Sequence, residues 1–311
     1  MPIDPWPGLE IRHLVALVAV DEHGSISRAA DHLGYTQSAV SQQIGALERL
    51  VGSPVFERPG GPRPLRLTEV GEVLLGHARA ALGHLRAAES EVRGVVAGEE
   101  GRVRVGTVQS VGTKVLPEVF RRFHQLRPGV DVELEESHDP AILLSRVIEG
   151  ELDLTFAEEP LPVGRWSTRH VLDDPFVLMA PTASAEAARR SITIEEIAAL
   201  PLIGYRNPSC LSLTIGIFDQ MSETPRFVFQ SDDNGTIQGM VGAGVGYALV
   251  PLLTTEPDDP AIVLVPIDPA PAPRRIHIAW HADRRPSAAQ QEFVDVVAAV
   301  CADLTVAEPA A

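Results

Sequence analysis

Short polar side chains gather on one side of the stretch YTQSAVSQQIGALERLVG, residues 35–52. Ser38, Ser41 and Gln42 share that side at helical spacing. The opposite side is apolar, at steps of four, three and three: Val40, Ile44, Leu47 and Leu50. A glutamine amide can pair with adenine in the major groove of DNA, and a serine hydroxyl can bond several base edges. The solvated face of a small helical bundle would show the same pattern, and the pattern alone favours neither interpretation.

A second group of hydroxyl and amide side chains, Thr107, Gln109 and Ser110, lies between a predicted strand and a predicted helix. Free N–H groups at the start of a helix can hold a carboxylate or another oxygen-rich group. The segment YRNPSC precedes another predicted helix and offers similar side chains: Arg206, Asn207 and Ser209. Each of these residues would equally serve to cap its own helix, so the sequence predicts either a ligand site or a set of caps.

Two glycine-rich stretches resemble nucleotide-binding motifs without having their chemistry. In VGTVQSVGTK five residues separate the two glycines and a threonine precedes the lysine, whereas the phosphate loop needs four residues and then Gly-Lys. In GAGVG, Tyr247 stands at the third glycine position of the dinucleotide motif. Cys210 and Cys301 have no metal-site spacing, and no triad or carboxylate pair stands out. We therefore expect no enzyme activity, no metal and no cofactor.

Three predicted helices would position the first polar group. The first should stop near Gly24, and Ser25 is a suitable N-cap for a short second helix. Gly34 suits the left-handed position that ends this second helix. A tight turn then places Thr36 or Gln37 near the start of the third helix. Two helices joined through a glycine turn follow the plan of a helix-turn-helix, whose second helix enters the major groove of DNA.

The segment VFERPGGPRPLRLT, residues 55–68, has two short extended runs around a tip rich in proline and glycine. This pattern predicts a β-hairpin wing. Arg58, Arg63 and Arg66 would then lie beside the third helix, where they suit contact with phosphate or the minor groove. In an ordinary surface loop the same arginines would serve solubility alone.

Residues 13–79 resemble the winged helix-turn-helix of LysR-type transcriptional regulators. The shared residues stand in the family's order and nearly in its spacing: Gly24, Ser25, Ala29, Ala30, Leu33, Gln37, Ser41, Ile44, Leu47, Glu48, Gly52, Phe56, Arg58, Leu67, Thr68 and Gly71. The wing is slightly longer and richer in proline than the family's pattern. The resemblance implies that these residues contact double-stranded promoter DNA: Ser27, Arg28, Thr36, Gln37, Ser38, Ser41, Gln42, Arg58, Arg63 and Arg66. Ser27 and Ser38 stand where the family varies freely.

A long helix is predicted over residues 68–97, with Thr68 as its cap. Its apolar residues repeat at steps of three and four: Val70, Leu74, Ala78, Ala81, Leu85, Ala88, Val92 and Val95. Such a narrow seam is typical of a two-stranded coiled coil, so we expect self-association as a dimer or tetramer. At ~1.5 Å per residue the helix spans roughly 40 Å, enough to hold two DNA-binding heads about one DNA turn apart. A lone buried helix is the alternative.

Short strands and helices alternate from Arg102 onward, which predicts an α/β domain with partly parallel strands. This half resembles the effector-binding domain of the same family, which has two lobes joined by two crossovers, as in type II periplasmic binding proteins. The resemblance implies a winged domain at 8–67, a linker at 68–97 and an effector-binding domain at 101–311. Its lobes would be 101–160 with 272–304, and 161–271.

A small-molecule effector between these lobes is the further implication of the resemblance. Ser110 stands at the position that contacts the effector in many members of the family. We expect the following residues around the effector: Thr107, Gln109, Ser110, Phe156, Arg206, Asn207 and Ser209. Cys210 lies beside them, and oxidant sensors of this family generally use a pair of cysteines in this domain.

The charge of the chain is distributed unevenly. The whole chain of 311 residues has a net charge of −16; residues 1–97 hold nine Arg against eleven acids, and the remainder holds 17 basic residues against 31 acids. The acidity is therefore kept away from the predicted DNA-binding part, which permits binding to a polyanion. No apolar run approaches the ~18 residues of a membrane span, and the N-terminus lacks the pattern of a secretory signal. We expect a cytoplasmic protein without a membrane partner.

We predict a multidomain chain: a helical winged helix-turn-helix domain, a long linker helix and a two-lobed α/β effector-binding domain. Its function would be sequence-specific regulation of transcription in response to a small molecule, with an effect on the access of RNA polymerase. The alternative is a cytoplasmic small-molecule-binding protein or enzyme with an incidental helical N-terminal domain.

Overall fold

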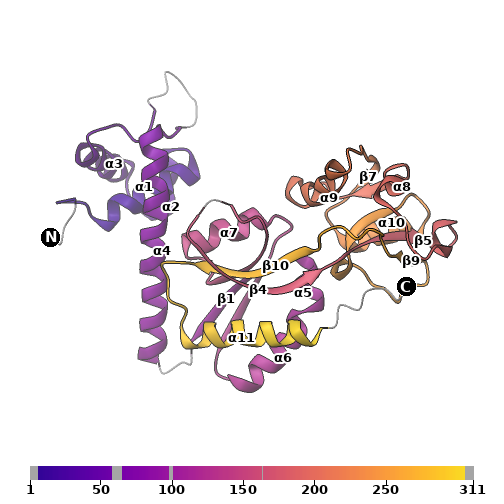
Figure 1. Ribbon diagram of the computed structural model, residues 1–311. Helices are drawn as coiled ribbons and strands as arrows, with labels where there is room; N and C mark the ends of the chain where they lie inside the picture. The colour runs from indigo at the N-terminus through magenta and orange to yellow at the C-terminus, as the bar shows by residue number, and fades with distance from the viewer. Residues whose placement is uncertain (1–5, 58–64, 98–100, 163, 305–311) are drawn as a thin grey trace. The chain divides into compact units, whose positions relative to one another are not determined.

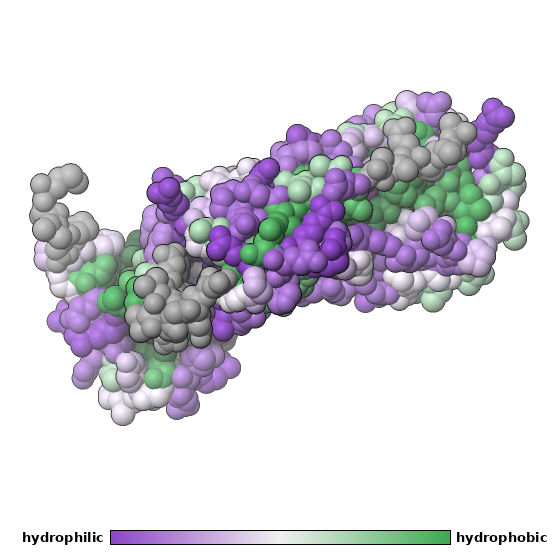
Figure 2. Space-filling model, turned by 90° about the horizontal axis from the view of Figure 1, so that it is seen from below, coloured by the Kyte–Doolittle hydropathy of each residue, from purple (hydrophilic) through white to green (hydrophobic). Residues whose placement is uncertain are grey.

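The computed structural model describes residues 6–57, 65–97, 101–162 and 164–304 (Figure 1). The chain folds as two compact units: residues 1–93 with 148–151, and residues 94–147 with 152–311. On the face drawn in Figure 2, hydrophilic residues predominate and hydrophobic ones gather in patches between them. No helix among the described residues is both long and apolar enough to span a membrane.

Three short helices form the head of the first unit: α1 (Ile11–His23), α2 (Ile26–Leu33) and α3 (Gln37–Val51). Gly24 and Gly34 end α1 and α2 with φ of 60° and 69°, a left-handed conformation that a side chain would disfavour. Both predicted helix ends are thus confirmed. Ser25 occupies the N-cap position of α2, but its hydroxyl makes no capping bond.

The predicted wing has a β-hairpin base. Phe56 and Leu67 form an antiparallel bridge, and the N–H of Glu57 donates to the carbonyl of Arg66 at 2.8 Å. The hairpin follows directly from the two extended runs of the sequence. Its tip, with Arg58 and Arg63, lies outside the described residues.

The long helix α4 (Glu69–Ala97) begins where the hydroxyl of Thr68 accepts a hydrogen bond from the N–H of Gly71 at 3.1 Å. Part of its apolar seam is used within its own chain. Leu74 and Ala78, together with Leu75 and Leu82, belong to the core that α1, α2 and α3 also line. Fewer residues of the seam are therefore available to pair with a second chain than the sequence indicated. A periodicity of three and four residues cannot show whether an apolar side chain packs within its own chain or against another chain.

A five-stranded sheet organises the first lobe of the second unit. Its strands, in sheet order, are β2 (Asp131–Glu136), β1 (Arg102–Thr107), β3 (Leu154–Glu158), β10 (Arg274–His281) and β4 (Trp166–Asp174). Its helices are α5 (Gln109–Lys114), α6 (Leu116–Leu126), α7 (Pro140–Glu149) and α11 (Ala288–Asp303). Strand β1 runs parallel to β2 and β3, and β10 runs antiparallel to β3 and β4, which confirms a partly parallel sheet. Phe123 of α6 packs edge-on against Phe293 of α11 in the core.

The second lobe contains two smaller sheets. The first has the order β8 (Ala248–Pro251), β5 (Phe176–Pro181) and β9 (Ile262–Val265), and the second pairs β6 (Pro201–Gly204) with β7 (Arg226–Gln230). Its helices are α8 (Ile194–Ala198), α9 (Pro208–Gln220) and α10 (Asn234–Gly242). A bridge between Leu202 and Tyr247 links the two sheets.

Three features of this unit differ from the sequence-based expectation. The alternating pattern of the sequence predicts one helix over residues 112–126 and no strand at 166–174 or 262–265. The structure has strands β4 and β9 at those two segments, and residues 112–126 form the end of α5 and all of α6. The residues of β4 were placed in the second lobe, whereas β4 pairs with β10 in the sheet of the first lobe. Most side chains of β4 are at least partly exposed, so its sequence lacks the apolar alternation that marks a half-buried strand.

Candidate DNA-reading surface and interlobe pocket

The start of α3 carries the polar group identified first. The hydroxyl of Thr36 accepts from the N–H of Ala39 at 3.2 Å and lies 3.1 Å from the hydroxyl of Ser38. The predicted apolar stripe is buried at Val40, Ile44 and Leu47, and partly buried at Leu50. These residues are exposed around the start of α3: Thr36, Gln37, Ser38, Ser41 and Gln42. The buried stripe packs α3 against the rest of the head, and the polar side chains on its other face remain accessible to a partner.

The other predicted DNA contacts lie on α2 and in the wing. Ser27 and Arg28 are exposed on α2, and Arg66 is exposed at the hairpin base. Within the described part of the chain, neither Arg28 nor Arg66 forms an ion pair. Arg79, by contrast, is paired with Asp21 at 3.1 Å.

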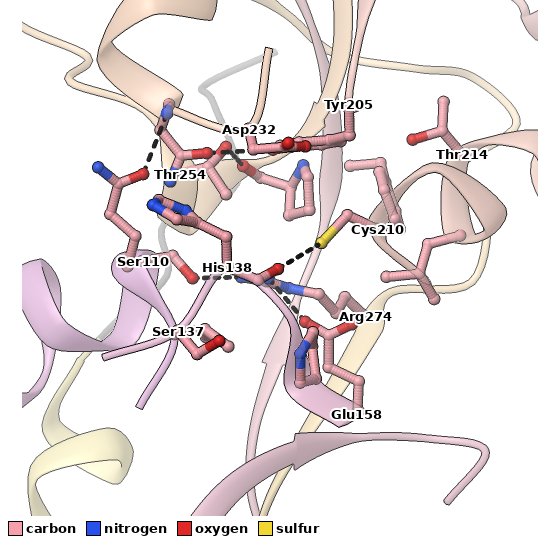
Figure 3. Close-up of a pocket in the computed structure, with 17 residues that line it drawn as sticks. Ser110, Ser137, His138, Glu158, Tyr205, Cys210, Thr214, Asp232, Thr254 and Arg274 are labelled. Carbon is pink, nitrogen blue, oxygen red and sulfur yellow. Dashed lines mark hydrogen bonds and ion pairs between the residues drawn. The ribbon is translucent and has the colours of Figure 1, made fainter. Parts of the chain in front are cut away.

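A pocket of about 50 Å³ lies between the two lobes of the second unit (Figure 3). The first lobe contributes Val108, Gln109, Ser110, Ser137, His138, Pro140, Glu158 and Arg274. The second lobe contributes Phe176, Tyr205, Cys210, Leu213, Thr214, Asp232, Asn234, Pro251 and Thr254. On this measure a cavity of roughly 10–15 Å³ already holds a water molecule, so the pocket accommodates a small molecule.

Arg274 is the centre of the charged network at this pocket. Its guanidinium group donates to Asp174 at 2.6 and 3.1 Å, to Glu158 at 2.9 Å and to the hydroxyl of Ser110 at 3.0 Å. Arg274 is 8% exposed and Asp174 is fully buried. Burial alone would lower the pKa of Arg274, but the carboxylates of Glu158 and Asp174 hold it above its ordinary value. The arginine therefore stays charged inside the protein.

Tyr205 and Cys210 line the pocket in their neutral forms. Burial raises the pKa of the Tyr205 phenol to about 12 and the pKa of the Cys210 thiol to about 11. The phenol donates to the side-chain oxygen of Asn234 at 3.3 Å, and the sulfur of Cys210 lies 3.8 Å from the carbonyl of His138. Because the thiolate is the reactive form of cysteine, Cys210 is in an environment that suppresses its reactivity.

Gln109 connects the two lobes across the mouth of the pocket. Its amide nitrogen donates to the carboxylate of Asp233 at 2.9 Å, and its amide oxygen accepts from the N–H of Asn234 at 3.0 Å. An ion pair of 2.5 Å between Lys114 and Glu256 adds a second connection. These contacts hold the lobes in a closed arrangement.

Only Gln109 and Ser110 of the predicted effector residues lie in the pocket wall. Phe156 is 1% exposed and packs in the core of the first lobe, and Thr107 is buried. Asn207 caps α9 by accepting from the N–H of Ser209 at 2.8 Å, and Arg206 donates to the carbonyl of Gln230. The other five residues predicted to surround the effector do not line this pocket: Thr107, Phe156, Arg206, Asn207 and Ser209.

Sequence reasoning missed Arg274, Glu158 and Asp174. Each is a charged residue at the end of a strand and stands next to a second charged residue, so the sequence does not mark it as buried. Their pairing could not be deduced, since Asp174 and Arg274 lie 100 positions apart and Ser110 and Arg274 lie 164 apart.

Comparison with protein families matches both units of the chain. Residues 11–72 match the family described as "Bacterial regulatory helix-turn-helix protein, lysR family", and residues 97–302 match the "LysR substrate binding domain". The second match alone covers more than half of the chain.

Relatives and solved structures agree with this. CfxR of Cupriavidus necator, an HTH-type transcriptional regulator, is 31% identical over 91% of this chain and 89% of its own. YybE of Bacillus subtilis, an uncharacterized regulator of the same type, is 27% identical over 88% of this chain and 92% of its own. Full-length CbnR in complex with its target DNA has a similar fold, with a TM-score of 0.62 and 21% identity over 94% of this chain and 100% of that one. Both matched models are those of LysR regulators and the named relatives are transcriptional regulators, so the chain belongs to the LysR family and is a DNA-binding transcriptional regulator with a substrate-binding domain.

Proposed function

We propose that this regulator reads its promoter with the exposed polar side chains of α3 and responds to a small molecule bound in the interlobe pocket. The observation that supports the pocket best is Gln109, which reaches from the first lobe to Asp233 and Asn234 of the second. A molecule that enters beside Ser110 must either open these bonds or strengthen the closed arrangement. Binding energy is thereby converted into a change of the lobe angle.

For DNA binding, the proposal assigns base contacts and phosphate contacts to different side chains. Ser41 and Gln42 carry hydrogen-bonding groups without charge and suit base edges, whereas Arg28 and Arg66 carry charges that no ion pair among the described residues neutralises, and suit phosphates. Arg58 and Arg63 are proposed for the same role in the wing.

Self-association is proposed through the free part of the α4 seam. Leu85 is 44% exposed and Val92 is 60% exposed, although both are large apolar residues in the predicted stripe. A second copy of α4 would cover them and bring two reading helices to one inverted-repeat site. We further propose that the effector changes DNA bending and the access of RNA polymerase.

The experiment that tests the effector site is a thermal-shift screen of metabolites on the full chain, followed by two variants. Ser110→Trp should fill the pocket and remove the shift, because Ser110 is 3% exposed and lies in its wall. Thr113→Trp is the matched control, since Thr113 is exposed on the same short helix. Both variants should still bind promoter DNA. A Ser110→Trp protein that responds to the metabolite as the parent does would place the effector elsewhere.

A further inference from the structure

We infer that the interlobe pocket selects a small molecule with an ammonium group over one with a carboxylate. This inference rests on the proposal that the pocket is the effector site. It reverses the first expectation from the sequence, in which helix N–H groups would hold a carboxylate or a similar group. Helix α5 is only six residues long, and the hydroxyl of Ser110 already accepts a hydrogen bond from Arg274.

The single arginine of the pocket is already occupied. A guanidinium group has five N–H donors, and Arg274 uses four of them on Asp174, Glu158 and Ser110. Its two ion pairs are buried, with Arg274 side-chain exposure of 7% against 18% for Glu158 and none for Asp174. An incoming carboxylate would have to displace one of these carboxylates, which would leave that group uncompensated in a low-dielectric site.

The remaining polar wall accepts hydrogen bonds and carries negative charge. Two carboxylates, those of Glu158 and Asp232, line the wall beside one guanidinium group, and a third, that of Asp174, binds Arg274 without lining the pocket. One oxygen of Glu158 binds Arg274, and among the described residues the other oxygen has no hydrogen-bond partner. Figure 3 shows Glu158 and Arg274 on one side of the pocket, with the carbonyl of His138 nearby. An ammonium group has three donors and a positive charge, so it complements this wall.

The size and the apolar parts of the pocket restrict the rest of the molecule. The pocket measures about 50 Å³, several times the roughly 10–15 Å³ that one water molecule needs on this measure, which suits an ammonium head on a short carbon chain. Phe176, Leu213 and Pro251 would cover the carbons. The hydroxyl of Ser110 still has its own proton to donate, so a hydroxyl or ether oxygen on the ligand would add a second polar contact.

Three probes of nearly the same size test this inference on the full-length protein: ethanolamine as the cation, ethylene glycol as the neutral molecule and glycolate as the anion. Thermal shift and calorimetry would be run at equal millimolar concentrations and constant ionic strength, at a pH where ethanolamine is protonated. We expect ethanolamine alone to stabilise the protein. Glu158→Gln should weaken its binding about tenfold or more, and Glu158→Asp, which keeps the charge, should restore part of it.

Glu195→Gln is the matched control, because Glu195 is exposed on α8. Stabilisation by glycolate but not by ethanolamine, no stabilisation by ethanolamine, or unchanged ethanolamine binding in Glu158→Gln would overturn the inference. Ser110→Trp separates this result from the proposed function. If Ser110→Trp abolishes the binding of whichever probe binds, the pocket remains the effector site, even if that probe is not ethanolamine and the inferred ligand class is wrong. Ethanolamine binding that persists in Ser110→Trp would reject the pocket itself.

Discussion

The proposed reading surface on α3 and the interlobe pocket use polar side chains in opposite ways. Ser41 and Gln42 are exposed and lie outside the hydrophobic core. Arg274 and Asp174 are buried and bind each other across neighbouring strands of the first lobe, so they belong to its core. The difference indicates that polar changes on α3 should alter binding without altering stability. Polar changes at the pocket should alter both.

The largest expected effect is at Arg274. Arg274→Leu leaves the carboxylate of Asp174 fully buried without a countercharge, although the N–H of Leu253 still donates to it, and should lower the free energy of unfolding by about 3–5 kcal/mol. Arg275→Leu is the control on the adjacent residue, where the ion pairs are half-exposed and contribute about 0–1 kcal/mol. Urea denaturation followed by the fluorescence of Trp166 and Trp280, both in the second unit, measures the difference. Equal losses in the two variants would mean that the network is not buried as described.

On α3 the expected effect is on DNA alone. Gln42→Ala should weaken binding to a promoter fragment selected in vitro by about 1–3 kcal/mol, because a base contact is lost. Its unfolding curve should coincide with that of the parent. Arg66→Ala should instead weaken binding to all sequences and reduce its dependence on salt. The contrast between the two surfaces fails if Gln42→Ala unfolds earlier or if both variants lose affinity for all DNA alike.

The exposed part of the α4 seam, with Leu85 and Val92, is a third surface for this comparison, because it is exposed like the polar side chains of α3 but apolar. Leu85→Asp should weaken self-association by about 2 kcal/mol or more, since it places a charge in a buried apolar contact between two chains. Val73→Asp is the control, because Val73 is 62% exposed on the same helix but outside the predicted seam. Sedimentation of the two variants at equal concentration decides the matter. A Leu85→Asp protein that sediments as the parent would remove α4 as the pairing element.

The smallest expected effect concerns pH. Burial lowers the pKa of His277 below its ordinary 6.5, and neighbouring His170 and Arg275 act in the same direction while Glu159 and Asp173 oppose it. The folded state therefore resists a proton that the unfolded state takes up. Stability should be full above the ordinary pKa and decline as the pH falls below it. His277→Gln should lose less stability on acidification than the parent, whereas His124→Gln, at an exposed site on α6, should follow the parent.

The helices of the head could be predicted because their determinants are local. Gly24, Gly34 and Thr36 act within a few residues of their own helix ends, and the buried stripe of Val40 and Leu47 follows one periodicity. Local rules of this kind were sufficient to predict the helix-turn-helix and the base of the wing.

Elements without a local signature were missed or misplaced. Strand β4 is mostly exposed, so its position in the sheet of the first lobe depends on β10, far away in the chain. The network of Arg274, Asp174 and Ser110 depends on contacts over 100 positions or more. Tertiary pairing of this kind is determined by the folded topology and leaves no periodic trace in the sequence.

Gly71 has a mechanical consequence for signal transfer within the first unit. A Cβ atom at this position would lie 2.1 Å from the carbonyl oxygen of Val55, so only glycine lets α4 approach the base of the wing so closely. Thr68 donates to the carbonyl of Pro54 at 2.8 Å, and the carboxylate of Glu48, near the end of α3, accepts from the N–H of Val55 at 3.0 Å. Direct contacts thereby connect the first turn of α4 to the base of the wing, and the base of the wing to α3. We therefore expect a rotation of α4 about its axis to move the exposed polar side chains of α3 with it.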